Sequence, residues 1–165
     1  MTVAIQGLSQ PVVLVTGGGR GLGAAIARRF ADDDAIVIVA DLEKPVQDDP
    51  RIRFEQADVS DAEEVALLFS RLTHEHSRLD TLVNNAGVWF RRPFAEISAD
   101  EWDHVLGVNL RGVFLCTQAA LEPMRTRGGG SVINIGSQAG SVALAPVPMM
   151  VPISPSRSVG SVGGS

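Results

Sequence analysis

The sequence predicts an α/β fold in which a doubly wound parallel sheet of about five strands is covered by helices. Short apolar runs recur along the chain and alternate with amphipathic segments, which is the order that such a sheet requires. The first two runs are apolar without alternation, as expected for parallel strands buried on both faces. A glycine-rich stretch joins the first apolar run directly to the first amphipathic segment.

The first strand is expected over residues 12–15 and the first helix over 24–30. Between them lies the loop Thr16-Gly17-Gly18-Gly19-Arg20-Gly21-Leu22-Gly23. This arrangement is typical of a phosphate cradle, because the unpaired N–H groups and the dipole of a helix N-terminus favour an anion. Gly17 can take a positive φ, Gly21 has no Cβ to hold a pyrophosphate away, and Gly23 lets the helix pack close to the strand. A tight turn that is merely rich in glycine is the alternative interpretation.

The second strand is expected over residues 35–40, and Asp41 follows it directly. In a dinucleotide-binding fold, an acid at the end of the second strand hydrogen-bonds the adenosine ribose hydroxyls and repels a phosphate on that ribose. Arg20 could attract such a phosphate, but Leu42 adds no further positive charge. The sequence therefore favours NAD over NADP. A solvated acid at a strand end is the alternative interpretation.

The middle of the chain is expected to supply a third strand, a helix and a fourth strand. A polar loop over 44–50 leads to a strand over 52–56, a helix that ends at about His74, and a strand over 79–83. Ser60 and Glu63 have the spacing of a capping box, which predicts that the helix begins just after Ser60. His74 and His76 lie among polar residues with no third ligand near, so a metal site is not predicted.

One long helix is expected over residues 99–127. Ser98 and Glu101 form a second capping box at its start, and consecutive glycines end it. Asn109 falls in the middle, and because asparagine is an indifferent helix former, an exposed position is the simplest explanation. The apolar side of the helix is expected to consist of Trp102, Val105, Leu106, Leu110, Val113, Phe114 and Thr117.

Two of the expected strands end in polar residues. Asn84-Asn85-Ala86-Gly87 follows the fourth strand, and Gly136 and Ser137 follow the fifth, which is expected over 131–135. Asparagine bonds to local backbone and glycine allows a sharp turn, so an ordinary turn would explain the first group. The functional interpretation is a strand end that keeps its backbone beside a cofactor.

Composition narrows the classes of function. The 165 residues carry a formal net charge of -5 without a basic cluster, so a nucleic-acid partner is not expected. The start of the chain has no positively charged region and no long apolar segment, so no signal peptide is expected. The apolar stretch 143–153 is short and broken by prolines, which argues against a membrane span. Cys116 is the single cysteine, and this favours a reducing, cytoplasmic location.

Taken together, the motifs resemble the short-chain dehydrogenase/reductase family, and the resemblance covers about residues 12–140. The family's Rossmann-type fold binds a nicotinamide dinucleotide. Its motifs match the glycine loop 16–23, the Asp58-Val59 pair, Asn84-Asn85-Ala86-Gly87, the helix residue Asn109 and the strand-end residue Ser137. The resemblance implies that the cofactor is held by Thr16, Gly17, Gly19, Arg20, Gly21, Leu22, Gly23, Asp41, Leu42, Asp58, Val59, Asn85, Ala86 and Gly87.

Members of this family move a hydride between the nicotinamide and an alcohol or ketone. The resemblance implies that Ser137 holds the substrate oxygen and that Asn109 holds a water in the proton relay. In the family a Tyr-x-x-x-Lys pair supplies the proton. This sequence has no tyrosine, and Lys44 is its single lysine. Ile153 and Arg157 stand where the pair belongs, with Pro155 between them, so the chain is expected to be inactive.

The chain is expected to divide into an incomplete dinucleotide-binding domain, 1–140, and an irregular, disordered, low-complexity tail, 141–165. A truncated or frame-shifted reading frame would explain the departure from the family. Three functions remain open: an NAD-linked oxidoreductase, a non-catalytic remnant that binds a nucleotide, and a partner that joins full-length relatives. A homo- or hetero-oligomer would use the long helix over 99–127.

Overall fold

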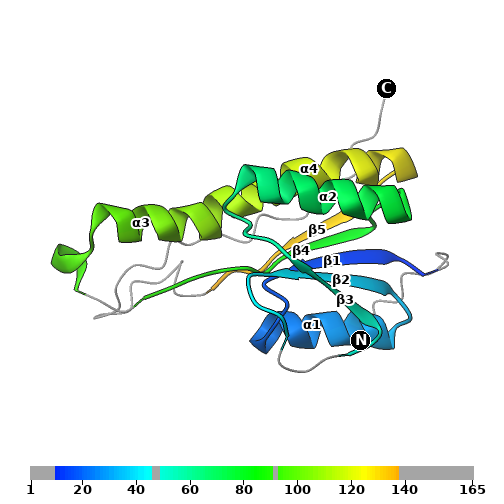
Figure 1. The fold of residues 1–165 in the computed structure, drawn as a ribbon, viewed down its shortest axis with the longest axis horizontal. Helices are drawn as coiled ribbons and strands as arrows, with labels where there is room; N and C mark the ends of the chain where they lie inside the picture. Colours follow the sequence, from blue (N-terminus) through cyan, green and yellow to red (C-terminus); the bar gives the residue numbers. More distant parts are fainter. Residues whose placement is uncertain (1–9, 46–48, 91–92, 138–165) are drawn as a thin grey trace.

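The computed structural model of the chain describes residues 10–45, 49–90 and 93–137. In order, the elements are β1 (Val12–Thr16), α1 (Gly21–Asp32), β2 (Ile36–Asp41), β3 (Ile52–Gln56), α2 (Ala62–His76), β4 (Thr81–Asn84), η1 (Phe94–Glu96), α3 (Ala99–Leu106), η2 (Gly107–Gly112), α4 (Val113–Arg127) and β5 (Ser131–Asn134). The strands form one parallel sheet in the order β3-β2-β1-β4-β5. Figure 1 shows α1 on one face and α2 and α4 on the other, which confirms the predicted doubly wound fold.

The strand order reverses between β1 and β4. The chain moves outward from β1 to β2 and β3, and then returns to place β4 on the other side of β1. Loops that leave neighbouring strands in opposite directions open a crevice at the carboxyl edge of the sheet, where ligands bind in open α/β folds. The glycine loop follows β1 and the Asn-Asn-Ala-Gly turn follows β4, so both lie at this edge.

The core has two layers because helices cover both faces of the central strands. Val13, Val15 and Val37 pack with α1, whereas Leu14 and Leu82 pack with α2 and α4. β1 is therefore buried at every position, which explains why its sequence is apolar without alternation. The expected strand boundaries are confirmed to within one or two residues, and the connection between β2 and β3 has no helix in its described residues.

The first capping box was predicted one residue too early. Asp61, not Ser60, is the N-cap of α2, and its carboxylate accepts from the N–H groups of Glu63 at 2.8 Å and Glu64 at 3.1 Å. The Ser60 hydroxyl instead donates to the Asp58 carboxylate at 2.7 Å. Serine and aspartate are both good N-cap residues. Because Asp58 binds the Ser60 hydroxyl, Asp61 caps the helix instead. The capping box of Ser98 and Glu101 at α3 is confirmed.

The predicted apolar side of the long helix was wrong for three of its seven members. Trp102, Leu110 and Phe114 are exposed, and the buried stripe consists of Val105, Val108, Gly112, Cys116 and Ala120. A π-helical segment, η2, joins α3 to α4, and the buried side of this helix is the one that faces α2 and Val59. Gly112 lies in this segment, where a Cβ would come within 2.9 Å of the Val59 side chain. Close approach of the helix therefore selects glycine there.

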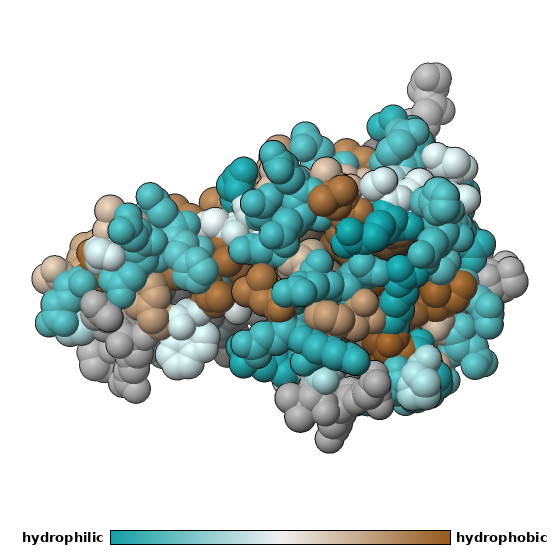
Figure 2. All heavy atoms as spheres, viewed as in Figure 1, coloured by the Kyte–Doolittle hydropathy of each residue, from teal (hydrophilic) through white to brown (hydrophobic). Residues whose placement is uncertain are grey.

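The three helical segments form one rod. Figure 1 shows α4 beside α2 on the sheet, while α3 extends beyond the carboxyl edge of the strands. In Figure 2, hydrophilic side chains cover most of α2, and separate hydrophobic groups show between them, one where α3 leaves the sheet. Within the described residues, no helix has both the length and the apolar character needed to cross a bilayer.

A buried carboxylate joins three elements at the amino edge of the sheet. Asp80 is 3% exposed and accepts from the Val12 N–H at 2.7 Å. The same carboxylate pairs with Arg78, whose Nε lies 3.2 Å away, and with Arg127 at the end of α4. A buried charge is tolerated when it is paired and hydrogen-bonded, so this cluster fixes where β1, β4 and α4 meet.

Replacing Asp80 with alanine should lower the free energy of unfolding by about 3–5 kcal/mol, because the substitution removes the buried acceptor of two guanidinium groups. Asp33→Asn is the matched control, since it breaks the exposed 3.0 Å pair of Arg29 and Asp33 and should cost less than about 1 kcal/mol. Urea denaturation of the three proteins measures both changes. Equal losses would show that the buried cluster contributes no more than a surface pair.

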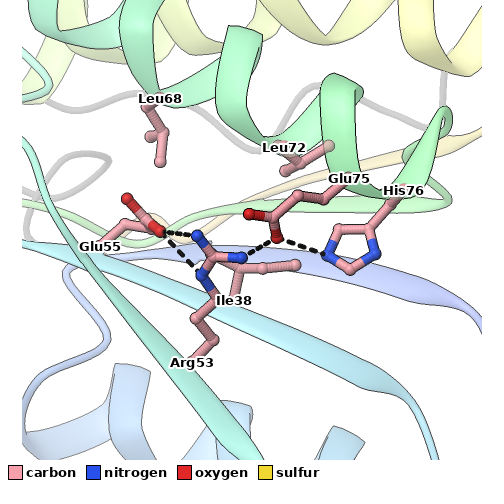
Figure 3. Close-up of a pocket in the computed structure, with 7 residues that line it drawn as sticks. All are labelled: Ile38, Arg53, Glu55, Leu68, Leu72, Glu75 and His76. Atoms are coloured by element: carbon pink, nitrogen blue, oxygen red, sulfur yellow. Dashed lines mark hydrogen bonds and ion pairs between the residues drawn. The ribbon is translucent and has the colours of Figure 1, made fainter.

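A small pocket lies between α2 and the edge strand β3 (Figure 3). Arg53 bridges Glu55 and Glu75 across it, and Arg71 donates to Glu55 at 2.9 Å. His76 Nε2 is buried there without a hydrogen bond and lies 3.8 Å from Glu75 Oε2. Burial, and then the charges of Arg53 and Arg78, hold the pKa of His76 below its usual value of 6.5. The neutral imidazole is therefore the form that fits the fold.

The free energy of unfolding should fall as the pH drops below about 6.5, because the unfolded chain then binds a proton that folded His76 resists. The slope between pH 7.5 and 5.5 cannot exceed about 1.4 kcal/mol per pH unit for one group. His76→Gln should flatten this part of the curve, whereas His74→Gln, its exposed neighbour, should not. An unchanged curve for His76→Gln would exclude His76 as the source.

Candidate functional site

The residues predicted to bind a cofactor follow β1, β2, β3 and β4, and therefore gather at one edge of the sheet. The glycine loop leaves β1, Asp41 ends β2, Asp58 follows β3, and Asn85 follows β4. Parallel strands bring their carboxyl ends to the same edge, so residues far apart in the sequence become neighbours. The pocket of Figure 3 lies against α2 and β3 and includes none of these residues.

The glycine loop is held in a compact turn with an open helix start. Gly17 has φ 62°, and its N–H donates to the Ala40 carbonyl at 2.7 Å. Arg20 is the N-cap of α1, but its side chain makes no capping hydrogen bond, and the first turn contains no acid. Gly21 has φ 55°, and a Cβ there would meet no atom within 4 Å. Gly21 and Leu22 are exposed, and without a side-chain cap the first-turn N–H groups are left for an anion.

Thr16 and Asn85 fasten this loop to the turn after β4. The buried Thr16 hydroxyl accepts from the N–H groups of Asn85 and Ala86, both at 3.1 Å. In return, the Asn85 amide nitrogen donates to the carbonyls of Thr16 at 3.1 Å and Gly17 at 2.9 Å. A Cβ on Gly23 would overlap both the Gly17 carbonyl and the Asn85 amide. The close packing therefore requires glycine at position 23 and asparagine at position 85.

Asp41 is tied to the same loop. One carboxylate oxygen accepts from the Gly19 N–H at 2.8 Å, and the other accepts from the Leu42 N–H at the same distance. The oxygen bonded to Leu42 also accepts from the Glu43 N–H at 3.5 Å. These bonds fix the carboxylate at the end of β2, beside the glycine loop, and the oxygen bonded to Gly19 keeps a lone pair for a hydroxyl donor. Arg20 and Lys44 are both exposed near this end of the sheet.

Asp58 and Val59 have different environments although they are adjacent. Asp58 Oδ1 accepts from the Ser60 N–H at 2.8 Å and from its hydroxyl at 2.7 Å. Val59 is 6% exposed and packs against Gly112 of the helical rod. The pair thus shapes the turn between β3 and α2 at the far side of the carboxyl edge from β5.

Asn109 does not occupy the exposed position that the sequence suggested. It is half-buried in η2, where Nδ2 donates to the Val88 carbonyl and Oδ1 accepts from the Val88 N–H, both at 2.8 Å. This pairing holds the loop after Gly87 against the helical rod. The π-helical segment at the same point leaves backbone carbonyls outside the regular α-helical ladder.

Ser137 is exposed and lies just beyond the carboxyl end of β5, one strand away from the Asn85 turn. The structure therefore brings Ser137 to the same edge as the glycine loop. Lys44 follows β2, on the other side of β1, and so lies several strands away from Ser137. Ile153, Arg157 and the predicted tail over 141–165 lie outside the described residues, as does the predicted domain boundary at Gly140.

Sequence reasoning missed a second polar bridge behind this edge. The Asn84 amide is buried and donates to the Thr117 hydroxyl at 3.1 Å and to Asn134 Oδ1 at 2.9 Å. It joins β4, α4 and β5. The two consecutive asparagines could have indicated this bridge. Side chains of successive residues in an extended chain point to opposite sides, so Asn84 and Asn85 bind different partners. Among the described residues, no group of three His, Cys, Asp or Glu side chains is placed to hold a metal ion.

A family model described as short chain dehydrogenase matches residues 11–151. An uncharacterized oxidoreductase of Thermotoga maritima is 36% identical over 139 residues, which are 79% of this chain and 54% of the relative. A D-threitol dehydrogenase of Mycolicibacterium smegmatis is 38% identical over 146 residues, which are 83% of this chain and 56% of the relative.

A solved short chain dehydrogenase of Leptospira borgpetersenii serovar Hardjo-bovis, with bound NAD+, has a TM-score of 0.78 and 30% identity. The match covers 82% of this chain and 54% of that structure. The chain thus spans little more than half the length of the relatives that it matches.

Thr16→Val should lower the free energy of unfolding by about 1–3 kcal/mol, because it keeps the side-chain shape but removes the acceptor of the Asn85 and Ala86 N–H groups. Thr16→Ser is the matched control, since it retains the hydroxyl, and it should preserve most of the stability. Thermal and urea unfolding compare the two variants. A valine variant as stable as the parent would mean that this hydroxyl does not hold the two loops together.

Proposed function

The chain belongs to the short chain dehydrogenase family, and from this premise we propose that it binds NAD along the carboxyl edge of its sheet. One observation supports the proposal above the others: the start of α1 has no side-chain cap and no acid in its first turn, and Gly21 and Leu22 are exposed there. A pyrophosphate fits there, because it would accept from the first-turn N–H groups and meet the positive end of the helix dipole. NAD bound to the Leptospira relative supports the same ligand class.

The remaining cofactor contacts follow from the order of the strands. Asp41 would accept from the adenosine ribose hydroxyls, while Asp58 and Val59 would lie beside the adenine. The other half of the dinucleotide would extend over β4, where Asn85, Ala86 and Gly87 form the turn. Arg20, Leu22 and Leu42 are exposed at the rim and would cover the phosphates and the ribose.

A bound nicotinamide would supply hydride chemistry for an alcohol or ketone. In this chain, Ser137 would hold the substrate oxygen through its hydroxyl. Both ends of the Asn109 amide contact Val88, so its part would be to shape the loop beside the ring and to expose a backbone carbonyl to water. With no tyrosine in the sequence, no side chain of the family's kind supplies the proton. We therefore propose binding without efficient turnover.

NAD+ should bind at least about tenfold more tightly than NADP+, because the Asp41 carboxylate would repel the ribose phosphate. Titration calorimetry with both cofactors measures the ratio. Asp41→Asn should narrow the difference by weakening this repulsion, whereas Asp58→Asn, at the adenine, should leave the ratio nearly unchanged. Equal or tighter binding of NADP+ by the parent chain would show that Arg20 outweighs Asp41.

The chain alone should form no NADH from alcohols, since loss of a positioned acid–base group typically costs about two to four orders of magnitude. Ile153→Tyr combined with Arg157→Lys should not restore activity, because Pro155 interrupts the segment that must hold the pair. Grafting a complete family C-terminal half after Gly140 should restore it. Butane-2,3-diol and a sugar alcohol are suitable substrates, since relatives act on a butanediol and on D-threitol. Turnover by the unmodified chain that Ser137→Ala abolishes would overturn this proposal.

A second candidate function is that of a subunit partner for full-length relatives. The exposed flank of the helical rod favours it, because Leu110, Phe114 and Leu121 are each about half exposed, at 50%, 58% and 51%. Apolar side chains gathered along a helix are typical of an interface. Measuring the mass in solution, alone and mixed with a full-length relative, separates a homo-oligomer from a hetero-oligomer. The proposal includes a cytoplasmic location, in keeping with the single cysteine.

A further inference from the structure

We propose that Trp89 forms an aromatic wall at the nicotinamide end of the site, where its indole contacts an apolar or aromatic ring of the bound ligand. The inference rests on the proposed function, because it requires a dinucleotide along the carboxyl edge of the sheet. The ring could belong to the nicotinamide or to an alicyclic alcohol or ketone beside it, and the experiment below separates these sources.

The position of Trp89 follows from the strand order. Asp41 ends β2 and the helix start at Gly21 lies beside β1, so these two groups fix the direction of the ligand. The next strand in that direction is β4, about 4.8 Å from β1. The turn after β4 touches the glycine loop, since a Cβ on Gly17 would lie 2.7 Å from Ala86 Cα. Trp89 follows this turn, two residues beyond Gly87.

The backbone next to Trp89 is fixed. The Val88 N–H donates to Asn109 Oδ1 and its carbonyl accepts from Asn109 Nδ2, while its side chain packs against the core cluster of α2 and α4. Trp89 itself is 71% exposed and belongs to neither core cluster. Tryptophan is usually highly buried, because its large apolar surface dominates packing energy. A tryptophan displayed on a pinned backbone at the site edge is suited to contact a ligand.

The chemistry of indole sets the ligand class. Its face packs against flat or apolar rings and attracts a cationic ring such as oxidised nicotinamide, with an energy that corresponds to about a two- to tenfold change in affinity. The indole N–H remains as a single donor at the edge. Trp89 therefore favours ligands that contain an apolar or aromatic ring.

Fluorescence can observe this contact directly, because the sequence has two tryptophans and no tyrosine. Trp102→Phe leaves Trp89 as the single fluorophore, and Trp89→Phe leaves Trp102, which lies on α3, as the matched control. Each full-length variant is titrated with ADP-ribose, which lacks the nicotinamide, and with NAD+. Cyclohexanone is then added to the protein saturated with NAD+. Calorimetry follows the binding of both nucleotides independently of the fluorescence.

NAD+ should quench Trp89 while ADP-ribose does not, if the nicotinamide supplies the ring. If Trp89 fluorescence instead changes when cyclohexanone is added, and does so only in the presence of NAD+, the contact is with the substrate. This result also supports the aromatic wall. Trp89→Ala should weaken NAD+ binding about two- to tenfold in the first case and leave ADP-ribose binding unchanged. Trp102 should respond to none of the ligands.

The inference is overturned if calorimetry shows that NAD+ binds but Trp89 responds to neither the nicotinamide nor cyclohexanone. It is also overturned if Trp102 responds equally, because the signal is then not local. If calorimetry detects no binding of ADP-ribose or NAD+, the proposed function itself fails, and the wall fails with it. The two failures are thus distinguished by the calorimetric result.

Discussion

The hydrogen bonds between Thr16 and Asn85 are the constraint on which the site depends. They hold the loop after β1 against the turn after β4, at the point where the strand order reverses. A reversal of strand order opens a crevice, but flexible loops would fill it with mobile backbone. Because a buried hydroxyl and an amide satisfy the polar groups of both loops, the crevice keeps its shape and leaves the helix start at Gly21 open.

The helical rod of α3, η2 and α4 also holds loops at the carboxyl edge of the sheet. Its π-helical segment places Asn109 opposite Val88 and Gly112 against Val59, so one distortion positions the loops after both β4 and β3. At the opposite edge, Asp80 joins β1, β4 and the end of α4. The carboxyl edge of the sheet therefore belongs to strands whose amino ends are fixed by a buried charge cluster, and several contacts that stabilise the candidate site lie outside it.

The strands, the glycine loop and the second capping box could be predicted because their signals are local: apolar runs, glycines and a short cap spacing. The errors came from contacts between distant segments. Asp61 caps α2 because the Ser60 hydroxyl donates to Asp58 instead. Leu110 and Phe114 are exposed because the opposite side of the rod, with Gly112 and Cys116, packs against Val59 and the core. The apolar periodicity of a helix does not indicate which distant segments the helix packs against. The Asp80 cluster could not be predicted from the sequence either, because Val12 and Arg127 are far from Asp80 along the chain.

Amide hydrogen exchange measured by NMR tests most directly whether the dinucleotide edge is formed before any ligand binds. The account predicts slow exchange at Asn85 and Ala86 in the protein alone, because both N–H groups donate to buried Thr16. It predicts fast exchange at Gly21 and Leu22, which are exposed and whose N–H groups have no helical acceptor, and protection of both when NAD+ is added. Unprotected amides at 85–86 in the protein alone, or amides at 21–22 that NAD+ leaves unchanged, would contradict the account.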